Sequence, residues 1–382
     1  MRILYFSRGY TPHDYRFLTS LAGAGYEVLF LRLEQHGRQV EDRSLPPTVE
    51  QLSWRGGKGP FRWRDVPGLI GSLRDVLRRV KPDILHAGPI QTGAFLGALS
   101  GFQPLVSMSW GSDLLQDAGR NPWYHWITSY TLRHSTLLVG DNPSVRAKAV
   151  ALGFPNERIY TFPWGIDLNQ FSPSKGSVDP VEPDLRARLG WQQNFVVLSL
   201  RSWEPVYGVD VMLRGFALAA QQAPELRLLM LGGGSQAGLV HRLIQEKGLQ
   251  DIVHLGGQVK QADLPGFYRA ADLYASAAHS DGSSVSLMEA LGTGLPVLVT
   301  DIPSNHEWVD EGEQGWLFPD GDEYTLAECF LSALRSPERL AEMRRNARAR
   351  AEERADWQKN FQVLASAYTA AVDIAKRRGR TG

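Results

Sequence analysis

The chain has 382 residues, more than one ordinary domain holds and suited to two lobes of similar size. Hydrophobic residues make up 43% and charged residues 21%, as in folded globular proteins, and the formal net charge of zero argues against a general nucleic-acid binder. The single cysteine, Cys329, excludes an intrachain disulfide and a cysteine-based zinc site, and it fits a reducing cytoplasm.

Short apolar runs alternate with amphipathic stretches along the first half, which predicts strand–helix units of a parallel sheet. The first run, Ile3–Phe6, is too short for the apolar region of a signal peptide and is expected to be a buried strand. Helices are expected over Arg16–Ala24, Val66–Val80 and Trp123–Arg133. The unpatterned region Glu34–Gly59 is expected to be a mobile surface loop. Further strands are expected over Val28–Leu33, Ile84–His86, Pro104–Ser107, Thr136–Val139 and Ile159–Phe162.

The same alternation continues in the second half, after a segment rich in proline and serine. The expected division is an N-terminal domain 1–171, a linker 172–184, a C-terminal domain 185–355, and a final helix 356–382 that packs back toward the first domain. No stretch approaches the ~18 uncharged apolar residues of a membrane span, so any membrane contact would be peripheral. Strands are expected over Phe195–Leu200, Leu226–Leu231, Ile252–Leu255, Leu273–Ser276, Pro296–Val299 and Gly315–Phe318, and helices over Leu326–Leu334, Pro337–Glu353 and Trp357–Lys376.

The most informative segment runs from Ser280 to Val299 and contains two acids, Asp281 and Glu289. Ser283 or Ser284 can cap a helix that begins near Val285, and the free amide groups of such a terminus hold phosphate well. Glu289 could then reach the hydroxyls of a ribose, and Asp281 those of a sugar. The alternative is an ordinary helix N-terminus with surface acids.

Two neighbouring strand ends add to this segment. Arg201 follows the run Phe195–Leu200, where a guanidinium can take a diphosphate through two hydrogen bonds, although a solvated surface charge is the more common role. Leu231-Gly-Gly-Gly is a turn that lets a ligand approach the backbone, but such turns also occur without a ligand. Ligands of open α/β sheets bind outside the carboxyl ends of strands, so a cleft between two lobes is expected to hold the site.

Taken together, these segments resemble the retaining glycosyltransferases of family 4, which have the GT-B fold. The resemblance covers nearly the whole chain and implies an α/β protein of two doubly wound Rossmann-like lobes that face each other across a cleft, followed by C-terminal helices. In the second half it is carried by the Arg201 loop ending in Gly208, Leu231-Gly-Gly-Gly, Leu255-Gly-Gly, Ala271-Asp-Leu-Tyr, the Asp281-to-Glu289 segment and Pro296-to-Asn305. In the first half it is carried by Met1-to-Ser7, Gly25-Tyr-Glu-Val, Lys81-to-His86, Trp110-Gly-Ser-Asp113 and Pro163-to-Asp167 with Phe171.

By that resemblance Arg201 binds the donor diphosphate, Glu289 the ribose and Asp281 the donor sugar, and these three are the predicted catalytic residues. The predicted donor-binding residues are Gly232, Gly233, Val259, Gly282, Ser283, Ser284 and Val285. The chain departs from the family in three places: Tyr207 stands where a lysine is usual, Trp110 where many members have a histidine, and Asp281 where glutamate is usual. Lys260 or Arg214 could replace the missing charge of the lysine.

Residues expected on the acceptor side or in the cleft are His13, Asp14, His86, Trp110, Asp113 and Tyr207. His13 and His86 are the candidates to replace the family's histidine, although a lone histidine is more often structural. Helix capping is the competing explanation for Asp14 and Asp113. Trp164 and Trp203 are also expected at strand ends that face the cleft, where aromatic rings suit sugars, whereas most of the eleven tryptophans are expected in the core.

The predicted function is retaining transfer of a sugar from a UDP- or GDP-sugar to a hydroxyl of a glycan or lipid-linked acceptor. The expected location is the cytoplasm, where the protein could work at the inner membrane surface. No metal and no cofactor are expected, because no Asp-x-Asp pair accompanies the site and Arg201 with the helix terminus can stabilise the leaving diphosphate. The alternatives are a catalytically silent sugar-nucleotide binder and a nucleotide-sugar epimerase. A basic stretch of Arg62, Arg64, Arg74, Arg78, Arg79 and Lys81 could rest on anionic lipid, or could be a solvated helix face.

Overall fold

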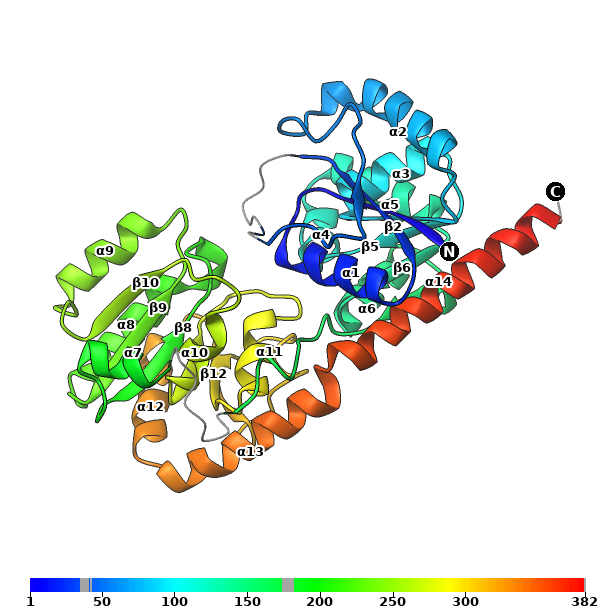
Figure 1. The fold of residues 1–382 in the computed structure, drawn as a ribbon. Coiled ribbons are helices and arrows are strands. Elements are labelled where there is room, and N and C mark those ends of the chain that lie inside the picture. Colours follow the sequence, from blue (N-terminus) through cyan, green and yellow to red (C-terminus); the bar gives the residue numbers. More distant parts are fainter. Residues whose placement is uncertain (35–40, 42, 174–181, 381–382) are drawn as a thin grey trace. The chain divides into compact units, whose positions relative to one another are not determined.

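The computed structural model describes residues 1–34, 41, 43–173 and 182–380, which form two compact units (Figure 1). Unit 1 consists of Met1–Trp164 together with Lys359–Gly382, and unit 2 consists of Gly165–Gln358. Each unit contains one parallel sheet with helices on both faces. The predicted class of two doubly wound α/β domains is therefore confirmed.

Seven parallel strands form the sheet of unit 1. The strands are β1 (Arg2–Ser7), β2 (Glu27–Arg32), β3 (Glu50–Gln51), β4 (Ile84–Ala87), β5 (Leu105–Met108), β6 (Leu137–Gly140) and β7 (Ile159–Thr161), in the order β3-β2-β1-β4-β5-β6-β7. The side chains of the central strands β1, β4, β5 and β6 are almost all buried, as expected when helices cover both faces. The helices are α1 (Pro12–Gly23), α2 (Val66–Val80), α3 (Phe95–Ser100), α4 (Ser112–Leu115), α5 (Pro122–His134), α6 (Pro143–Ala151) and the long C-terminal α14 (Trp357–Arg380).

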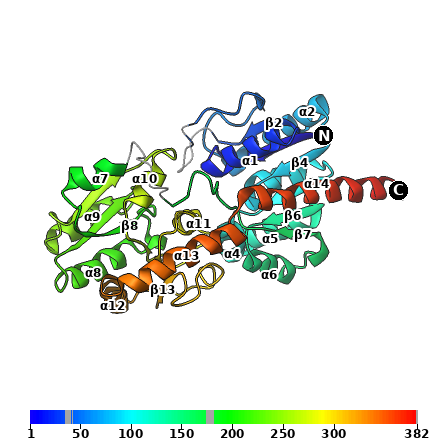
Figure 2. The ribbon, with the colours of Figure 1, turned by 60° about the horizontal axis from the view of Figure 1, so that its bottom comes forward.

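Local sequence explains where these helices begin. Thr11 and Asp14 form a reciprocal capping box at the start of α1, and the side chain of Asn121 accepts a hydrogen bond from Tyr124 N at the start of α5. Helix α14 runs along unit 1 (Figure 2), where Tyr368 hydrogen-bonds to His86 of β4. That contact brings the end of the chain onto the first sheet.

Six parallel strands form the sheet of unit 2, in the order β10-β9-β8-β11-β12-β13. They are β8 (Phe195–Ser199), β9 (Leu226–Leu231), β10 (Val253–Gly257), β11 (Leu273–Ser276), β12 (Val297–Thr300) and β13 (Gly315–Phe318). The helices are α7 (Glu182–Leu189), α8 (Val209–Ala220), α9 (Ala237–Glu246), α10 (Leu264–Arg269), α11 (Val285–Gly292), α12 (Glu323–Leu334) and α13 (Pro337–Arg354).

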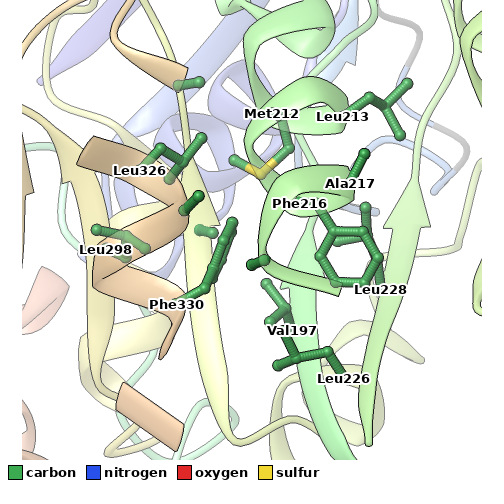
Figure 3. Packing of buried hydrophobic residues seen from close by; sticks show 14 of the residues in the cluster. Val197, Met212, Leu213, Phe216, Ala217, Leu226, Leu228, Leu298, Leu326 and Phe330 are labelled. Carbon is green, nitrogen blue, oxygen red and sulfur yellow. The ribbon is translucent and has the colours of Figure 1, made fainter. Parts of the chain in front are cut away.

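The core on one face of this sheet lies between α8 and α12. Figure 3 shows Phe216 of α8 and Phe330 of α12 packed over Val197 and Leu228 of the sheet, with the two phenyl centroids 6.0 Å apart. Gly215 permits this approach, because a Cβ there would lie 2.7 Å from the side chain of Leu326. The sheet of unit 2 is therefore tightly packed against α8 and α12, which fixes the positions of the loops at its strand ends.

The structure differs from the sequence predictions at the domain boundary. The expected boundary follows residue 171, whereas the contacts divide the chain after Trp164, because Ile166 and Phe171 are buried in the core of unit 2. Within the expected linker 172–184, residues 174–181 lie outside the described part of the chain, and α7 already begins at Glu182.

The expected surface loop Glu34–Gly59 also needs correction where it is described. It contains β3, which pairs in parallel with β2, and a buried tryptophan, Trp54, whose indole Nε1 donates to Arg32 O at 2.8 Å. Two strand residues are too few for a periodic pattern, so no pattern in the sequence indicated this packing. Residues 35–40 and 42 lie outside the described part.

Across the described residues, none of the helices combines the length and the apolar character that a membrane crossing requires.

Candidate active site

The sheet of unit 2 has a topological switch point between β8 and β11. The strands that follow β8 in sequence, β9 and β10, lie on one side of it, and β11, β12 and β13 lie on the other. Open parallel sheets bind ligands outside the carboxyl ends of their strands at such a point. Arg201 follows β8 there, and residues 277–284 lead from β11 into α11.

Arg201 is fixed at this point by side chains from the start of α11. Its Nη1 donates to Ser284 Oγ at 2.7 Å and to Ser286 Oγ at 3.1 Å, and its Nη2 lies 2.8 Å from Asp281 Oδ2. Only 12% of the Arg201 side chain is exposed, and the buried Nε has no hydrogen-bond partner in the structure. The guanidinium carbon lies 4.2 Å from the centre of the Tyr207 ring, a cation–π contact.

The charge of Arg201 is stabilised by the groups around it at the start of α11. Burial disfavours the cation of Arg201, but Asp281, Tyr274 and Tyr207 together outweigh burial and hold the pKa of the guanidinium above its ordinary value. Ser284 is the N-cap of α11, and its Oγ accepts from Leu287 N. The first amide groups of a helix have no partner within the helix, so the Arg201 cation and these amides offer neighbouring donors to an anion.

Glu289 lies one turn further along α11 and is 3% exposed. Its Oε1 accepts from Gln261 Nε2 at 2.9 Å and its Oε2 from the Tyr268 hydroxyl at 2.8 Å. Burial, and then the charge of Glu289, raise the pKa of Tyr268 well above its ordinary value, so this phenol remains a donor. The Tyr268 hydroxyl also lies 3.0 Å from Ser286 O, which places Glu289 next to the Arg201 cluster.

Sequence reasoning missed Ser286, Tyr268, Tyr274 and Gln261 in this cluster. The Tyr274 hydroxyl lies 2.9 Å from Ser286 Oγ, so Ser286 connects β11, α11 and Arg201. A serine two residues after an N-cap was a local signal. The tyrosines and the glutamine come from other elements. Tyr274 lies in the Ala271-Asp-Leu-Tyr segment and Gln261 lies two residues after Val259, so only Tyr268 stands away from the segments singled out in the sequence.

The glycine-rich turn after β9 is held against the Arg201 loop. Gly232 has φ 110°, and a Cβ there would lie 3.0 Å from Arg201 O. Gly233 O accepts from Trp203 N at 2.9 Å, and a Cβ on Gly234 would lie 2.5 Å from Trp203 O. Glycine is therefore needed here for packing of the two loops, whether or not a ligand also approaches. Trp203 itself is buried rather than open to a ligand.

The remaining donor-side candidates are placed as follows. Gly282 donates its N–H to Asp281 Oδ1 at 3.0 Å, and Ser283 and Val285, both partly buried, flank the N-cap of α11. Val259 packs, partly buried, against the core of unit 2 after β10, and Lys260 beside it is exposed. Arg214 lies on α8 within 3.4 Å of Asp210 and 3.7 Å of Glu323, so its charge is engaged with these acids.

The acid candidates in unit 1 are used for internal contacts. Asp14 is fully buried and accepts from Thr11 N at 2.8 Å and from the Tyr5 hydroxyl at 3.0 Å. Asp113 accepts from Ile90 N, Ser109 Oγ, Trp110 N and Leu114 N, at 2.6 to 3.0 Å. These bonds organise the loops that follow β1, β4 and β5.

The two histidine candidates differ in their surroundings. His86 is fully buried in β4, its Nδ1 hydrogen-bonds to the Tyr368 hydroxyl, and burial lowers its pKa to about 3. His13 is partly exposed at the start of α1, against the ring of Trp110 at 5.3 Å, and burial with Arg16 lowers its pKa to about 3. Its buried Nδ1 has no hydrogen-bond partner in the structure. Trp164 is buried against Trp110, not open to a ligand.

Among the described residues no group of three or more His, Cys, Asp or Glu side chains is arranged to hold a metal ion.

Comparison with known families decides how this site is interpreted. Residues 181–350 match the family described as "Glycosyl transferases group 1", and residues 2–142 match "Glycosyl transferase 4-like". The chain belongs to the family 4-like glycosyltransferases. The predicted family is thereby confirmed, and the two matches fall on the two units.

Curated relatives of this glycosyltransferase carry several activities in their names. It is 30% identical over 233 residues to a D-inositol 3-phosphate glycosyltransferase of Thermobispora bispora, an alignment that covers 58% of this chain and 53% of that protein. It is 26% identical to the enzyme of the same name from Thermomonospora curvata, over 92% of this chain and 88% of that protein. A mannosylfructose-phosphate synthase of Agrobacterium fabrum is 31% identical over 39% of this chain and 34% of its own length. The chain spans about half the length of the first of these relatives.

Solved structures share the fold of this glycosyltransferase. The crystal structure of Anabaena Alr3699/HepE in complex with UDP superimposes with a TM-score of 0.78 at 21% identity, over 97% of this chain and 100% of that one. The sucrose-phosphate synthase of Thermosynechococcus elongatus superimposes with a TM-score of 0.77 at 16% identity, over 97% and 98%. The GT-B fold expected from the sequence is confirmed.

Proposed function

We propose that this glycosyltransferase moves a hexosyl group from a nucleoside diphosphate sugar to a hydroxyl of an acceptor, with retention of the anomeric configuration. The observation that carries the proposal is Arg201, a buried cation held at the N-terminus of α11 and at the switch point of the sheet. The solved complexes of Anabaena HepE with UDP and with UDP-glucose support a uridine nucleotide as the first donor to test.

Donor binding would rearrange the pair of Arg201 and Asp281. The diphosphate carries more charge than a carboxylate and takes two hydrogen bonds from a guanidinium, so it displaces Asp281 from Nη2. Asp281 is then free to accept hydrogen bonds from hydroxyls of the donor sugar. The same exchange of partners thus provides a contact for the diphosphate, at Arg201, and a contact for the donor sugar, at Asp281.

In this reaction the site must stabilise the diphosphate as it leaves the sugar. As the bond from the anomeric carbon to the phosphate oxygen breaks, negative charge grows on that oxygen while the sugar becomes oxocarbenium-like. Arg201, bonded to the N-cap Ser284, and the amides of Ser284 and Val285 would stabilise that charge, and preorganised donors of this kind are worth about 3 to 4 kcal/mol each in a water-poor site. The departing oxygen takes the acceptor proton, so no protein base is required.

Glu289 is proposed to bind the ribose. Gln261 and Tyr268 hold its two oxygens in place, and a carboxylate at a nucleotide site accepts hydrogen bonds from ribose hydroxyls. For the acceptor we propose a hydroxyl of a sugar phosphate or glycan, because relatives are named for inositol phosphate and mannosylfructose phosphate. His13 and Trp110 are the partly exposed candidates of unit 1 for contacting it, and peripheral membrane contact is part of the proposal if the acceptor is lipid-linked.

The test combines binding with turnover. UDP, GDP and ADP, and their glucose, mannose and N-acetylglucosamine derivatives, are screened by thermal shift, and the donor that binds is then offered with inositol phosphate and simple sugars. We expect Arg201→Ala to abolish the shift and to lower kcat/KM by roughly a thousandfold. Arg214→Ala is the matched control, since it removes a cation of unit 2 that is engaged with acids of α8 and α12. An unchanged shift in Arg201→Ala removes Arg201 from the site.

A second candidate function is a silent sugar-nucleotide binder, and Tyr207 in place of a lysine is the observation that favours it. A thermal shift without transfer or hydrolysis for every donor and acceptor would support that function. An epimerase would instead release the free epimer of the sugar without an acceptor. The anomeric configuration of any transfer product, measured by the proton coupling at its anomeric carbon, tests retention.

A further inference from the structure

An aromatic patch on unit 1 has no role in the site described above. Among the described residues, six large hydrophobic side chains are exposed, and three of them are tryptophans in one place: Trp63 at 36%, Trp123 at 50% and Trp126 at 44%. The Trp63 and Trp123 ring centroids lie 5.9 Å apart, and Trp123 stacks on Trp126 at 5.2 Å. Isolated exposed apolar residues are ordinary, whereas a contiguous group indicates an interaction surface.

The patch is built on rigid elements. Trp123 and Trp126 lie on one side of α5, whereas Ile127, Thr128, Thr131 and Leu132 form its buried side. Trp63 belongs to the short 3-10 turn Trp63–Asp65 ahead of α2, and both Trp63 and Trp126 pack on the buried ring of Phe95 in α3. Helices α2, α3 and α5 lie together on unit 1 (Figure 1). The rings are therefore held in place from below while their outer faces remain in water.

Cations border the patch on two sides. Arg55, Lys58, Arg62 and Arg64 are all exposed and line a surface hollow beside Trp63. One acid, Asp65, also lines this hollow, so the four cations outnumber it. On the other side the exposed Arg120 lies over the Tyr124 ring at 5.3 Å, and the sequence has no acid between Asp117 and Asp141. The whole chain is neutral, so this concentration of positive charge is local.

The cations of the basic stretch between Arg62 and Lys81 have different surroundings in the structure. Arg74 donates to Ser100 O and Leu99 O at the end of α3, and Arg78 pairs with Asp75. Those two cations are engaged within unit 1. Arg62 and Arg64, by contrast, flank the exposed Trp63.

We propose that this surface, Trp63, Trp123 and Trp126 with the cations Arg55, Lys58, Arg62, Arg64 and Arg120, docks the protein on a bilayer of anionic phospholipid. Tryptophan rings settle at the level of the headgroups, where one edge is apolar and the indole N–H is wet. Lys and Arg beside them are attracted by the negative surface potential of anionic lipid, and the hollow beside Trp63 accommodates a headgroup phosphate. The proposal does not depend on the transferase activity.

Vesicle binding tests the proposal on the full chain. Sedimentation is measured with vesicles of phosphatidylcholine alone and of an equimolar mixture with phosphatidylglycerol, at low and high salt. We expect binding to the mixed vesicles, weak binding to phosphatidylcholine, and loss at high salt. Arg62→Gln with Arg64→Gln removes two of the bordering cations and should weaken partitioning about thirtyfold. Trp123→Ser with Trp126→Ser should weaken it by roughly tenfold or more.

Matched controls come from unit 2. Lys247→Gln with Arg345→Gln also removes two exposed cations, and Tyr324→Ser removes an aromatic ring that is 70% exposed. Neither control should change vesicle binding. Thermal unfolding of each variant shows that it is folded, and the thermal shift with UDP, a property assigned to unit 2, is measured separately.

Three results would overturn the proposal. The first is no binding to the mixed vesicles, and the second is equal binding to neutral vesicles. The third is wild-type binding by the tryptophan or arginine variants. If sedimentation velocity instead shows a dimer that Trp123→Ser with Trp126→Ser dissociates, and vesicles do not bind, the occupant of the patch is a second copy of the chain and the lipid proposal is wrong.

Discussion

The two units have sheets of the same kind, but the ionisable side chains at their strand ends have different partners. In unit 2, Arg201, Asp281 and Glu289 lie in one largely buried cluster with serine and tyrosine hydroxyls. In unit 1, Asp14, Asp113 and His86 bind neighbouring backbone and side-chain groups and fix the loops. Only His13 and Trp110 among the unit 1 candidates are partly exposed.

This difference shows what a common fold does and does not provide. A parallel sheet brings loops together at the carboxyl ends of its strands in both units, but it does not determine which side chains the loops keep for a ligand. A carboxylate that already accepts several backbone hydrogen bonds has little capacity left for a substrate. An ion pair such as Arg201 with Asp281 can exchange partners when a more highly charged ligand arrives.

After the loss expected for Arg201→Ala, the largest effect is expected from Asp281→Asn in unit 2. The substitution removes the carboxylate that competes for Arg201, so UDP should bind about tenfold more tightly. It also removes the acceptor proposed for the sugar hydroxyls, so kcat should fall by about a hundredfold. Calorimetry with UDP and steady-state kinetics measure the two effects. Asp210→Asn, which alters an acid paired with Arg214, is the control, and weaker UDP binding by Asp281→Asn would contradict the exchange of partners.

In unit 1 the corresponding effect should appear in stability and not in donor binding. Burial lowers the pKa of His86 to about 3, whereas an unfolded histidine titrates near its ordinary value of 6.5. Between these values the unfolded chain holds more protons than the native one. The stability contribution of neutral His86 is therefore complete above pH 6.5 and is lost as the pH falls toward 3, at up to about 1.4 kcal/mol per pH unit.

His86→Phe should reduce that slope by up to one proton, as measured by urea unfolding between pH 7 and pH 4. His13 has its pKa lowered to about 3 as well, so part of the slope should remain in the variant. The control is His125→Phe on α5, where the ring is exposed and loses little solvent on folding. A slope unchanged by His86→Phe, or donor binding weakened by it, would mean that the two units do not differ as described.

Much of the fold could be predicted because its signals are local. The predicted helix Val66–Val80 has the bounds of α2, since its apolar residues follow one face and a proline stands near its start. The strand runs Leu226–Leu231 and Gly315–Phe318 likewise match β9 and β13. The two-residue β3 and the start of α7 at Glu182 were missed, because the first is too short for periodicity and the second follows a proline-rich segment.

The candidate site could be predicted only in part, for a related reason. Arg201, Asp281 and Ser284 stand next to strand ends or a helix start, so the sequence alone brings them to one edge of a sheet. Gln261 and Tyr268 reach Glu289 from elsewhere, and Ser286 connects Arg201 with Tyr274 through side-chain distances alone. Such partners depend on tertiary packing, which no short pattern records.

The smallest expected effect is a change in UDP affinity on substitution of Tyr207, and it tests what this residue does. Its ring lies 4.2 Å from the guanidinium carbon of Arg201, on a loop that Gly208 holds close to β11, since a Cβ there would lie 2.0 Å from Ala277 O. If the Tyr207 ring positions the Arg201 cation, and so replaces in part the lysine that is usual in the family, Tyr207→Phe should bind UDP like wild type. Tyr207→Leu should bind it about threefold more weakly, the value of a partly exposed cation–π contact.

Tyr207→Lys completes this series, because it restores the charge that is usual in the family but removes the ring. Tighter UDP binding by this variant, measured by calorimetry, would show that the diphosphate lies within reach of residue 207 and that the site accepts a second cation. Equally weak UDP binding by Tyr207→Phe and Tyr207→Leu would contradict a role for the ring. The hydroxyl would then be the group that matters, and Tyr207 would act on the ligand directly instead of through Arg201.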